Sequence, residues 1–129
     1  MRLATSWASR RQAFTLVEVM IIVALIGMLA ALAIPSFIKV RKQSQGKRIV
    51  NDARIIDSAI DSWALENGKA DGATIDLAGA AGYTKTGTIS TVDLLGNDYQ
   101  IGVVGPTQVA IAASTKTALA GVAIDWGGY

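Results

Sequence analysis

The chain has 129 residues, of which 51% are hydrophobic, and a formal net charge of +2. It contains no cysteine, which excludes a disulfide framework and a thiolate metal site. It also contains no histidine, the most common general base and zinc ligand. At this length we expect at most one small folded domain, and these counts do not favour an enzyme.

The charges are segregated along the chain. Residues 1–13 carry three arginines and no acid, and residues 39–48 carry five basic residues and no acid. Residues 49–129 carry nine acids against four basic residues. The basic excess therefore lies outside the part of the chain that can fold as a head. A nucleic-acid-binding protein would place it on the folded domain, so we expect no nucleic-acid partner.

A short basic leader precedes a long apolar run. Residues 1–13, MRLATSWASRRQA, have no periodic apolar pattern and are typical of a leader that is removed by processing. From Val19 to Ile38 the chain has 20 residues without a charge. A helix of that length spans about 30 Å, the hydrocarbon thickness of a bilayer, and a helix that is apolar on all sides belongs in a membrane. We therefore predict that residues 14–38 form a membrane-spanning helix.

The start of this run carries a family resemblance. The chain reads Arg10-Arg11-Gln12-Ala13, then Phe14-Thr15-Leu16-Val17-Glu18, and is then apolar to Pro35. This order resembles the class III signal of type IV pilins and type II secretion pseudopilins. The resemblance implies that a prepilin peptidase cuts between Ala13 and Phe14 and methylates the new amine of Phe14. Ala13 departs from the family pattern, which usually has Gly there.

Glu18 is the one acid beside the apolar run, and it has two readings. A charge deep in a bilayer costs about 2.5–3.5 kcal/mol on insertion scales, so it usually has a partner. Cleavage before Phe14 would create an α-amine with a pKa of about 8, one helical turn from Glu18. The resemblance implies that Glu18 meets the amine of a neighbouring subunit during assembly. The other reading is an acid of the first helical turn that the helix dipole stabilises.

Two further positions of the apolar helix are singled out by the resemblance. Pro35 removes the N–H that would reach the Ala31 carbonyl, so the helix should bend or loosen there. In the family, the segment between the corresponding Gly and Pro loses its helix on polymerisation. The resemblance therefore implies such a change for Gly27–Pro35.

The spacing of apolar residues and the turn residues predict the second half of the helix and the elements of the head. Apolar residues recur at steps of three and four, and Asn67-Gly68 is typical of a helix end. The recurring apolar residues are Ile49, Ala53, Ile56, Ile60 and Trp63. We predict one helix from about Thr15 to Glu66, with a basic collar and an amphipathic half over residues 39–67. For the loop and sheet head of residues 68–129 we predict a short helix at 74–81 ended by Gly82, and strands at 99–104, 108–113 and 121–126. The fold class is then α+β and pilin-like, with a small antiparallel sheet covering the apolar stripe.

The basic collar of residues 39–48 also has two readings. It can anchor the chain at anionic lipid, or in a filament its charges can meet the acidic residues of neighbouring heads. Five positive charges after the apolar run and three before it do not favour a cytoplasmic N-terminus by the positive-inside rule. The resemblance nevertheless implies a cytoplasmic N-terminus, facing the peptidase, and a periplasmic head.

The head offers one weak candidate for a metal site. Asp93, Asn97 and Asp98 could give oxygen ligands to calcium. Their spacing matches no compact calcium loop, and Asp and Asn around a Gly are ordinary turn residues. We therefore expect no cofactor, and we find no catalytic constellation.

The sequence predicts a structural subunit of a type IV pilus-like filament. The absence of the cysteine pair of many pilins and the short head favour a type II secretion pseudopilin. The resemblance implies self-association, inner-membrane lipid, prepilin peptidase and an assembly platform with its ATPase as partners. The subunit would sit in the inner membrane as a single-pass protein before assembly, and in a periplasmic or surface filament afterwards. Two alternatives remain: a membrane-anchored periplasmic domain that never polymerises, and an exported soluble protein cut after Ala33.

Overall fold

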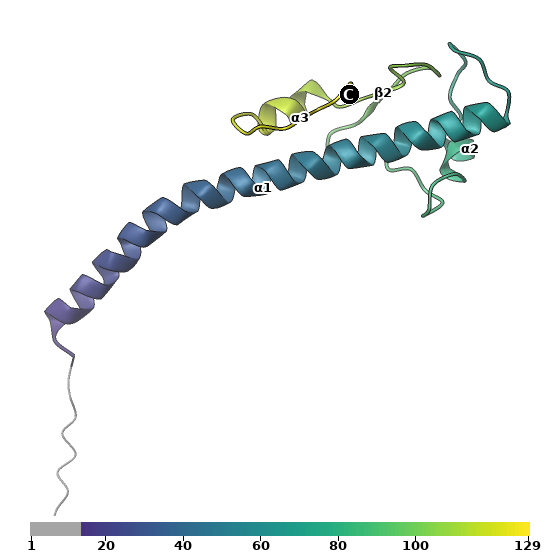
Figure 1. Cartoon of the computed structure of the whole chain (residues 1–129). Helices are drawn as coiled ribbons and strands as arrows, with labels where there is room; N and C mark the ends of the chain where they lie inside the picture. The colour runs from purple at the N-terminus through teal and green to yellow at the C-terminus, as the bar shows by residue number, and fades with distance from the viewer. Residues whose placement is uncertain (1–13) are drawn as a thin grey trace, which may run out of the picture. The chain divides into compact units, whose positions relative to one another are not determined.

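The structure, a computed structural model, describes residues 14–129. Its elements are α1 (Leu16–Glu66), α2 (Leu77–Ala81), β1 (Gln100–Ile101), β2 (Val109–Ala110) and α3 (Ala113–Ala118) (Figure 1). The predicted α+β class is confirmed, with a long N-terminal helix and a small antiparallel sheet. The chain divides into two units, residues 1–36 and residues 37–129, which we describe separately. The expected leader, residues 1–13, lies outside the described residues.

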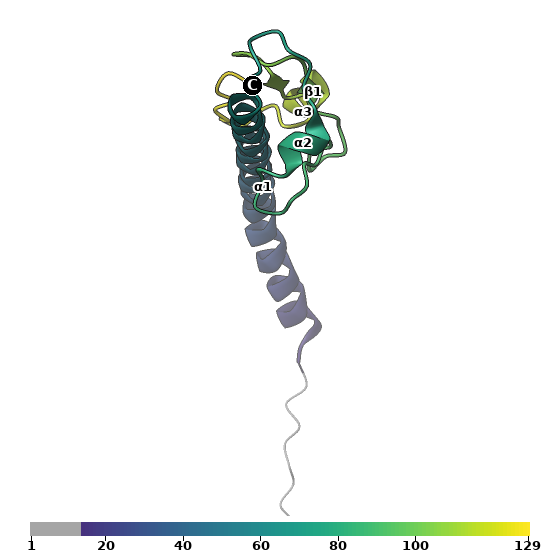
Figure 2. The same ribbon diagram turned by 90° about the vertical axis from the view of Figure 1, so that its right-hand side faces the viewer.

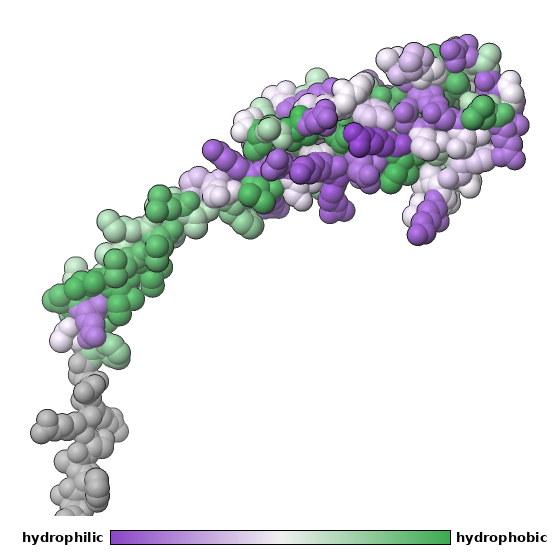
Figure 3. Space-filling model, in the orientation of Figure 1, coloured by the Kyte–Doolittle hydropathy of each residue, from purple (hydrophilic) through white to green (hydrophobic). Residues whose placement is uncertain are grey.

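The first unit is the apolar start of α1. By length and composition α1 could cross a membrane, and none of its most apolar window is buried within the chain. Figure 3 colours this part of α1 almost entirely as hydrophobic. The helix continues through Pro35, one residue before the boundary between the two units.

The second unit is built on the amphipathic half of α1. The predicted stripe is confirmed, because Ile49, Ala53, Ile56, Ile60 and Trp63 are all buried. Residues from the rest of the unit complete the core, and α2, α3 and β1 lie on one side of α1 (Figure 2). The completing buried side chains are Ala80, Tyr99, Val104, Val109, Ile111 and Leu119.

The helix end and the short helix follow local capping rules. The Asn67 side chain donates to the Trp63 carbonyl (2.8 Å), and Gly68 takes a φ of 59°, which favours glycine. The predicted helix at 74–81 is confirmed over Leu77–Ala81 only, and Gly82 ends it. It starts late because Thr74 pairs with Val103 in a β-bridge and the Asp76 carboxylate caps the helix by accepting from Ala78 N.

The predicted sheet is correct in its pairing and wrong in its size. β1 and β2 are antiparallel, with Gln100 opposite Ala110 and Ile101 opposite Val109. The strand predicted at 108–113 ends at Ala110, since α3 begins at Ala113.

The third strand, predicted at residues 121–126, is not present in the described structure. Residues 119–126, which we call the C-terminal strap, lie against α1 instead. Lys42 Nζ donates to the Ala120 carbonyl and Gln43 Nε2 donates to the Ala123 carbonyl, both at 3.4 Å. The backbone of the strap therefore finds hydrogen-bond partners in side chains of α1 and not in a sheet.

Candidate functional site

The start of α1 is a capped helix end. The Thr15 hydroxyl accepts a hydrogen bond from the Glu18 backbone N–H (3.2 Å), and the Thr15 carbonyl accepts one from Val19 N (3.3 Å). Thr15 is therefore the N-cap and Glu18 the third helical residue, which is the Thr-x-x-Glu pattern of a capping box. In this position the helix dipole favours the carboxylate. Sequence reasoning singled out Glu18 but missed Thr15, although their spacing was the available signal.

The structure places the predicted assembly residues on an exposed surface. Phe14 is 74% exposed and directly precedes the capped turn that holds Glu18. Gly27 and Pro35 lie further along the same helix, and a Cβ on Gly27 would meet no atom within 4 Å. Phe14 therefore stands immediately before the turn that holds Glu18, whereas Gly27 and Pro35 are separate positions further along the helix. Ala13, the other side of the expected cleavage, lies outside the described residues.

The apolar half of α1 exposes an unusual number of large hydrophobic side chains. Soluble monomers rarely expose a contiguous apolar surface larger than about 300–600 Å², so this one requires a membrane or a partner helix. The exposed side chains include Leu16, Val17, Met20, Ile21, Val23, Leu25, Ile26, Met28, Leu29, Leu32, Ile34 and Phe37.

The calcium candidates form a hydrogen-bonded turn. Asp93 is buried, and its Oδ1 accepts from the backbone N–H groups of Leu95 (2.8 Å) and Asn97 (3.0 Å). The buried Thr115 hydroxyl donates to Asp93 Oδ2 and accepts from Asn97 Nδ2 (3.0 Å). Asp98 is exposed beside this turn. The carboxylate oxygens of Asp93 thus hold the turn against α3, and within residues 14–129 no three acids come together to hold a metal ion.

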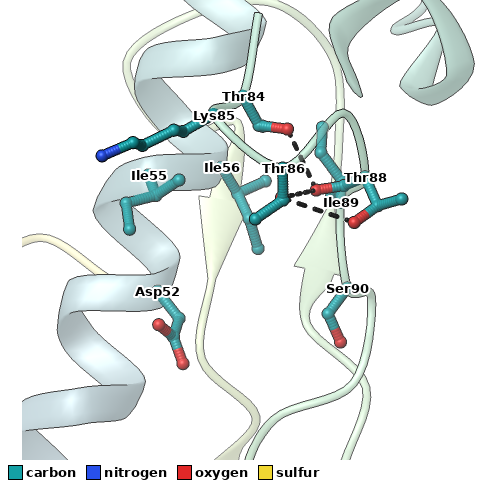
Figure 4. A pocket seen from close by; sticks show the side chains of 9 residues that line it. All are labelled: Asp52, Ile55, Ile56, Thr84, Lys85, Thr86, Thr88, Ile89 and Ser90. Carbon is teal, nitrogen blue, oxygen red and sulfur yellow. Dashed lines mark hydrogen bonds between the residues drawn. The ribbon is translucent and has the colours of Figure 1, made fainter. Parts of the chain in front are cut away.

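A hollow of about 370 Å³ lies between α1 and the loop that follows α2 (Figure 4). Ile55 and Ile56 of α1 and Ile89 of the loop give it an apolar floor. The hydroxyls of the loop are already used, because those of Thr84 and Thr86 both donate to the Thr88 carbonyl (3.1 and 3.2 Å). The lining supplies one carboxylate, from Asp52, and one ammonium, from Lys85. These groups suit packing and weak polar contact more than bond-making chemistry.

Comparison with known proteins gives two kinds of match. The model of the prokaryotic N-terminal methylation motif matches residues 8–34, which include the capped start of α1 and most of its apolar run. The type IV major fimbrial protein FimA of Dichelobacter nodosus is 32% identical, over 92% of this chain and 81% of its own length. The chain belongs to the type IV pilin family. Fimbrial protein Q of Moraxella bovis is 30% identical, over 88% of this chain and 77% of its own length.

The family also reaches proteins of type II secretion. The type II secretion system core protein G of Escherichia coli (strain K12) is 28% identical, over 70% of this pilin-family chain and 70% of its own length. These relatives are structural proteins, and the motif and the apolar helix fit anchoring in a membrane before assembly. No solved structure matches the chain significantly.

Two acids of this pilin-family head hold parts that are distant in sequence. Asp57 accepts from the Tyr129 hydroxyl (3.2 Å), and Asp61 accepts from Gln108 Nε2 (2.7 Å). Gln108 is 2% exposed, and its Nε2 also donates to the Asp57 carbonyl (3.2 Å). Sequence reasoning missed these contacts, because no local pattern indicates partners so far along the chain.

Proposed function

We propose that this chain is the repeating subunit of a type IV pilus-like filament and that it is built into the filament from the inner membrane. The observation that carries the proposal is the apolar half of α1, which is exposed on all sides and begins at a capped turn inside the matched methylation motif. In a filament, the same helices from many copies would bury this surface against one another. The likeness to fimbrial proteins, which covers most of each chain, supports this function.

Processing precedes assembly. A prepilin peptidase cuts between Ala13 and Phe14 and methylates the amine of Phe14. Two observations support this step: the matched motif spans the cleavage position, and Phe14 is exposed immediately before α1. The Thr15 cap starts the helix after this point, so Phe14 remains outside the helical hydrogen-bonding pattern.

Glu18 then acts in assembly. In an apolar environment its carboxylate is costly unless a cation neutralises it, and the amine created at Phe14 of an adjoining copy supplies that cation. The dipole of α1 stabilises Glu18 within the single subunit, which explains how the acid is tolerated before assembly. The segment Gly27–Pro35 loosens when the helices pack together, since Pro35 already lacks one helical donor.

The proposed function also implies where the subunit is located and which partners it needs. The subunit waits in the inner membrane as a single-pass protein, with its N-terminus in the cytoplasm and its head in the periplasm. Assembly requires a platform in that membrane and its ATPase, together with other copies of the chain. The filament then lies in the periplasm or at the cell surface.

A second candidate function is a type II secretion pseudopilin. It is favoured by the likeness to core protein G, which covers 70% of each chain, and by the absence of cysteine. Deletion of the chain in its own host separates the two. Loss of surface fibres with normal protein export indicates a pilus subunit, and loss of export without loss of surface fibres indicates a pseudopilin.

Substitution of Glu18 tests the proposed function. Glu18→Ala should be cleaved normally but should give no fibres when it is the only copy expressed, as seen by electron microscopy of sheared material. Asp52→Ala is the matched control, because it removes an exposed acid of the same helix outside the apolar run. Fibres from Glu18→Ala at the parental yield would refute the proposed role of this acid.

A further inference from the structure

The basic residues of the collar fall into two groups by their distance along α1 from the end of the apolar run. Headgroups extend a bilayer by roughly 5–8 Å on each side of its hydrocarbon core. If the core ends at Ile38, where the uncharged run ends, a rise of about 1.5 Å per residue places Lys47 and Arg48 about 13–15 Å beyond it. These two residues therefore lie outside the headgroup layer. The basic residues within reach of that layer are Lys39, Arg41 and Lys42.

Lys47 and Arg48 line a separate hollow on α1, with a volume of about 370 Å³. Lys47 lies about 160° around the helix from the buried Ile49, so its side chain points away from the core. At the edge of the hollow, Gln43 also holds the C-terminal strap through its hydrogen bond to the Ala123 carbonyl. Both basic side chains are exposed, and within residues 14–129 neither forms a hydrogen bond or an ion pair. The remaining lining residues are Val40, Gln43, Ser44 and Asn51. With two cations, the amide of Asn51, the hydroxyl of Ser44 and no carboxylate, the hollow suits an anionic group.

The head supplies anions of the required kind. Most of its acids already accept hydrogen bonds from within the chain, as Asp57, Asp61 and Asp93 do. The acids for which the described structure shows no hydrogen bond are Asp52, Asp71 and Asp98, and all three are exposed.

Position on the surface leaves two of these acids as candidates to bind the hollow of another copy. Copies that repeat head to tail in a filament meet through two different patches of their surface. Asp52 stands on α1 one turn after Arg48, too close to the hollow to belong to a different patch, and it lines the hollow between α1 and the loop after α2. Asp71 lies in the turn after α1, and Asp98 lies beside the turn of Asp93, so both belong to other surfaces.

We propose that the hollow formed by Lys47, Arg48 and their neighbours binds a carboxylate of a second copy of the chain, supplied by Asp71 or Asp98. The inference rests on the proposed filament function. It divides the collar between different tasks. Lys39 and Arg41 face lipid headgroups before assembly, Lys42 holds the C-terminal strap, and Lys47 and Arg48 join subunits.

Charge reversal tests the inference on the full chain in cells. Lys47→Glu with Arg48→Glu should lower the yield of sheared fibres at least tenfold, whereas cleavage before Phe14, followed by mass spectrometry, should remain normal. Lys69→Glu with Lys85→Glu is the matched control, because it makes the same change of charge elsewhere on the head. The control should retain the parental yield.

A charge swap then tests the identity of the partner. Adding Asp71→Lys and Asp98→Lys to the reversed collar restores the original net charge and should restore fibres. The inference would be overturned if the Lys47→Glu, Arg48→Glu chain gave the parental yield of fibres. It would also be overturned if the charge-swapped chain unfolded at the parental temperature but gave no fibres. Loss of cleavage in the reversed collar would also overturn it, by placing these residues at the membrane. If the parental chain itself forms no fibres, the proposed function fails instead.

Discussion

Gly46 stands where Ile124 of the C-terminal strap packs against α1, and its replacement by Ala should destabilise the head. A Cβ at this position would collide with Ile124 Cδ1 and would lie 2.9 Å from its Cγ1 and 3.1 Å from its Cγ2. Rotation about the last bond of Ile124 cannot relieve all three contacts, so the strap must move away from the helix. Overpacking of this kind costs about 1–3 kcal/mol, whereas Gly to Ala inside a helix gains about 0.5–1 kcal/mol. The net expectation is a loss of about 1 kcal/mol.

Thermal unfolding in mild detergent measures this loss, with fluorescence of the buried Trp63 as the signal. For a folded unit the size of residues 37–129, 1 kcal/mol lowers Tm by about 4–8 °C. Ile124→Ala is the informative background, because it removes all three contacting atoms. There Gly46→Ala should raise Tm, since only the better helix propensity of Ala remains. A rise of Tm in both backgrounds would refute the argument that close approach requires Gly46.

Three further substitutions test the hydrogen bonds of the head through Tm. Gln108→Glu places a second carboxylate against Asp61 and should lower stability by about 1–3 kcal/mol at pH 7. Stability should recover at pH 4, and an equal loss at both pH values would contradict this. Thr115→Val leaves the buried carboxylate of Asp93 without its hydroxyl donor and should cost about 1.5–3 kcal/mol, so an unchanged Tm would speak against that bond. Burial raises the pKa of Tyr99 from 10 to about 12. Because the unfolded chain ionises first, stability should hold below pH 10 and fall as the pH rises to 12, and Tyr99→Phe should flatten that fall.

The amphipathic half of α1 was predictable because its cause is local. Apolar residues at steps of three and four define one face, and the burial of Ile49, Ile56 and Trp63 confirms it. The end at Asn67-Gly68 was equally local, since a side-chain hydrogen bond and a left-handed glycine need only neighbouring residues. The pairing of β1 with β2 also came from a short connection between two apolar runs.

The strap was not predictable in the same way. Its apolar residues suggested a strand, but its backbone carbonyls accept from Lys42 and Gln43, about 80 residues earlier. The close approach of Gly46 to Ile124 appears only in three dimensions. At the candidate site, Glu18 was identified through the family resemblance, whereas its partner Thr15 needed the capping pattern. No sequence pattern connected Asp61 with Gln108.

The N-terminal residue of the chain in purified fibres tests the central claim most directly. Mass spectrometry of the first peptide should find N-methylated Phe14, because the claim requires cleavage after Ala13 and burial of the new N-terminus among apolar helices. Fibres whose subunits begin at Met1 would contradict processing. A mature chain found in solution and beginning at Ile34 would contradict the filament altogether, since it would have lost the apolar helix that builds it.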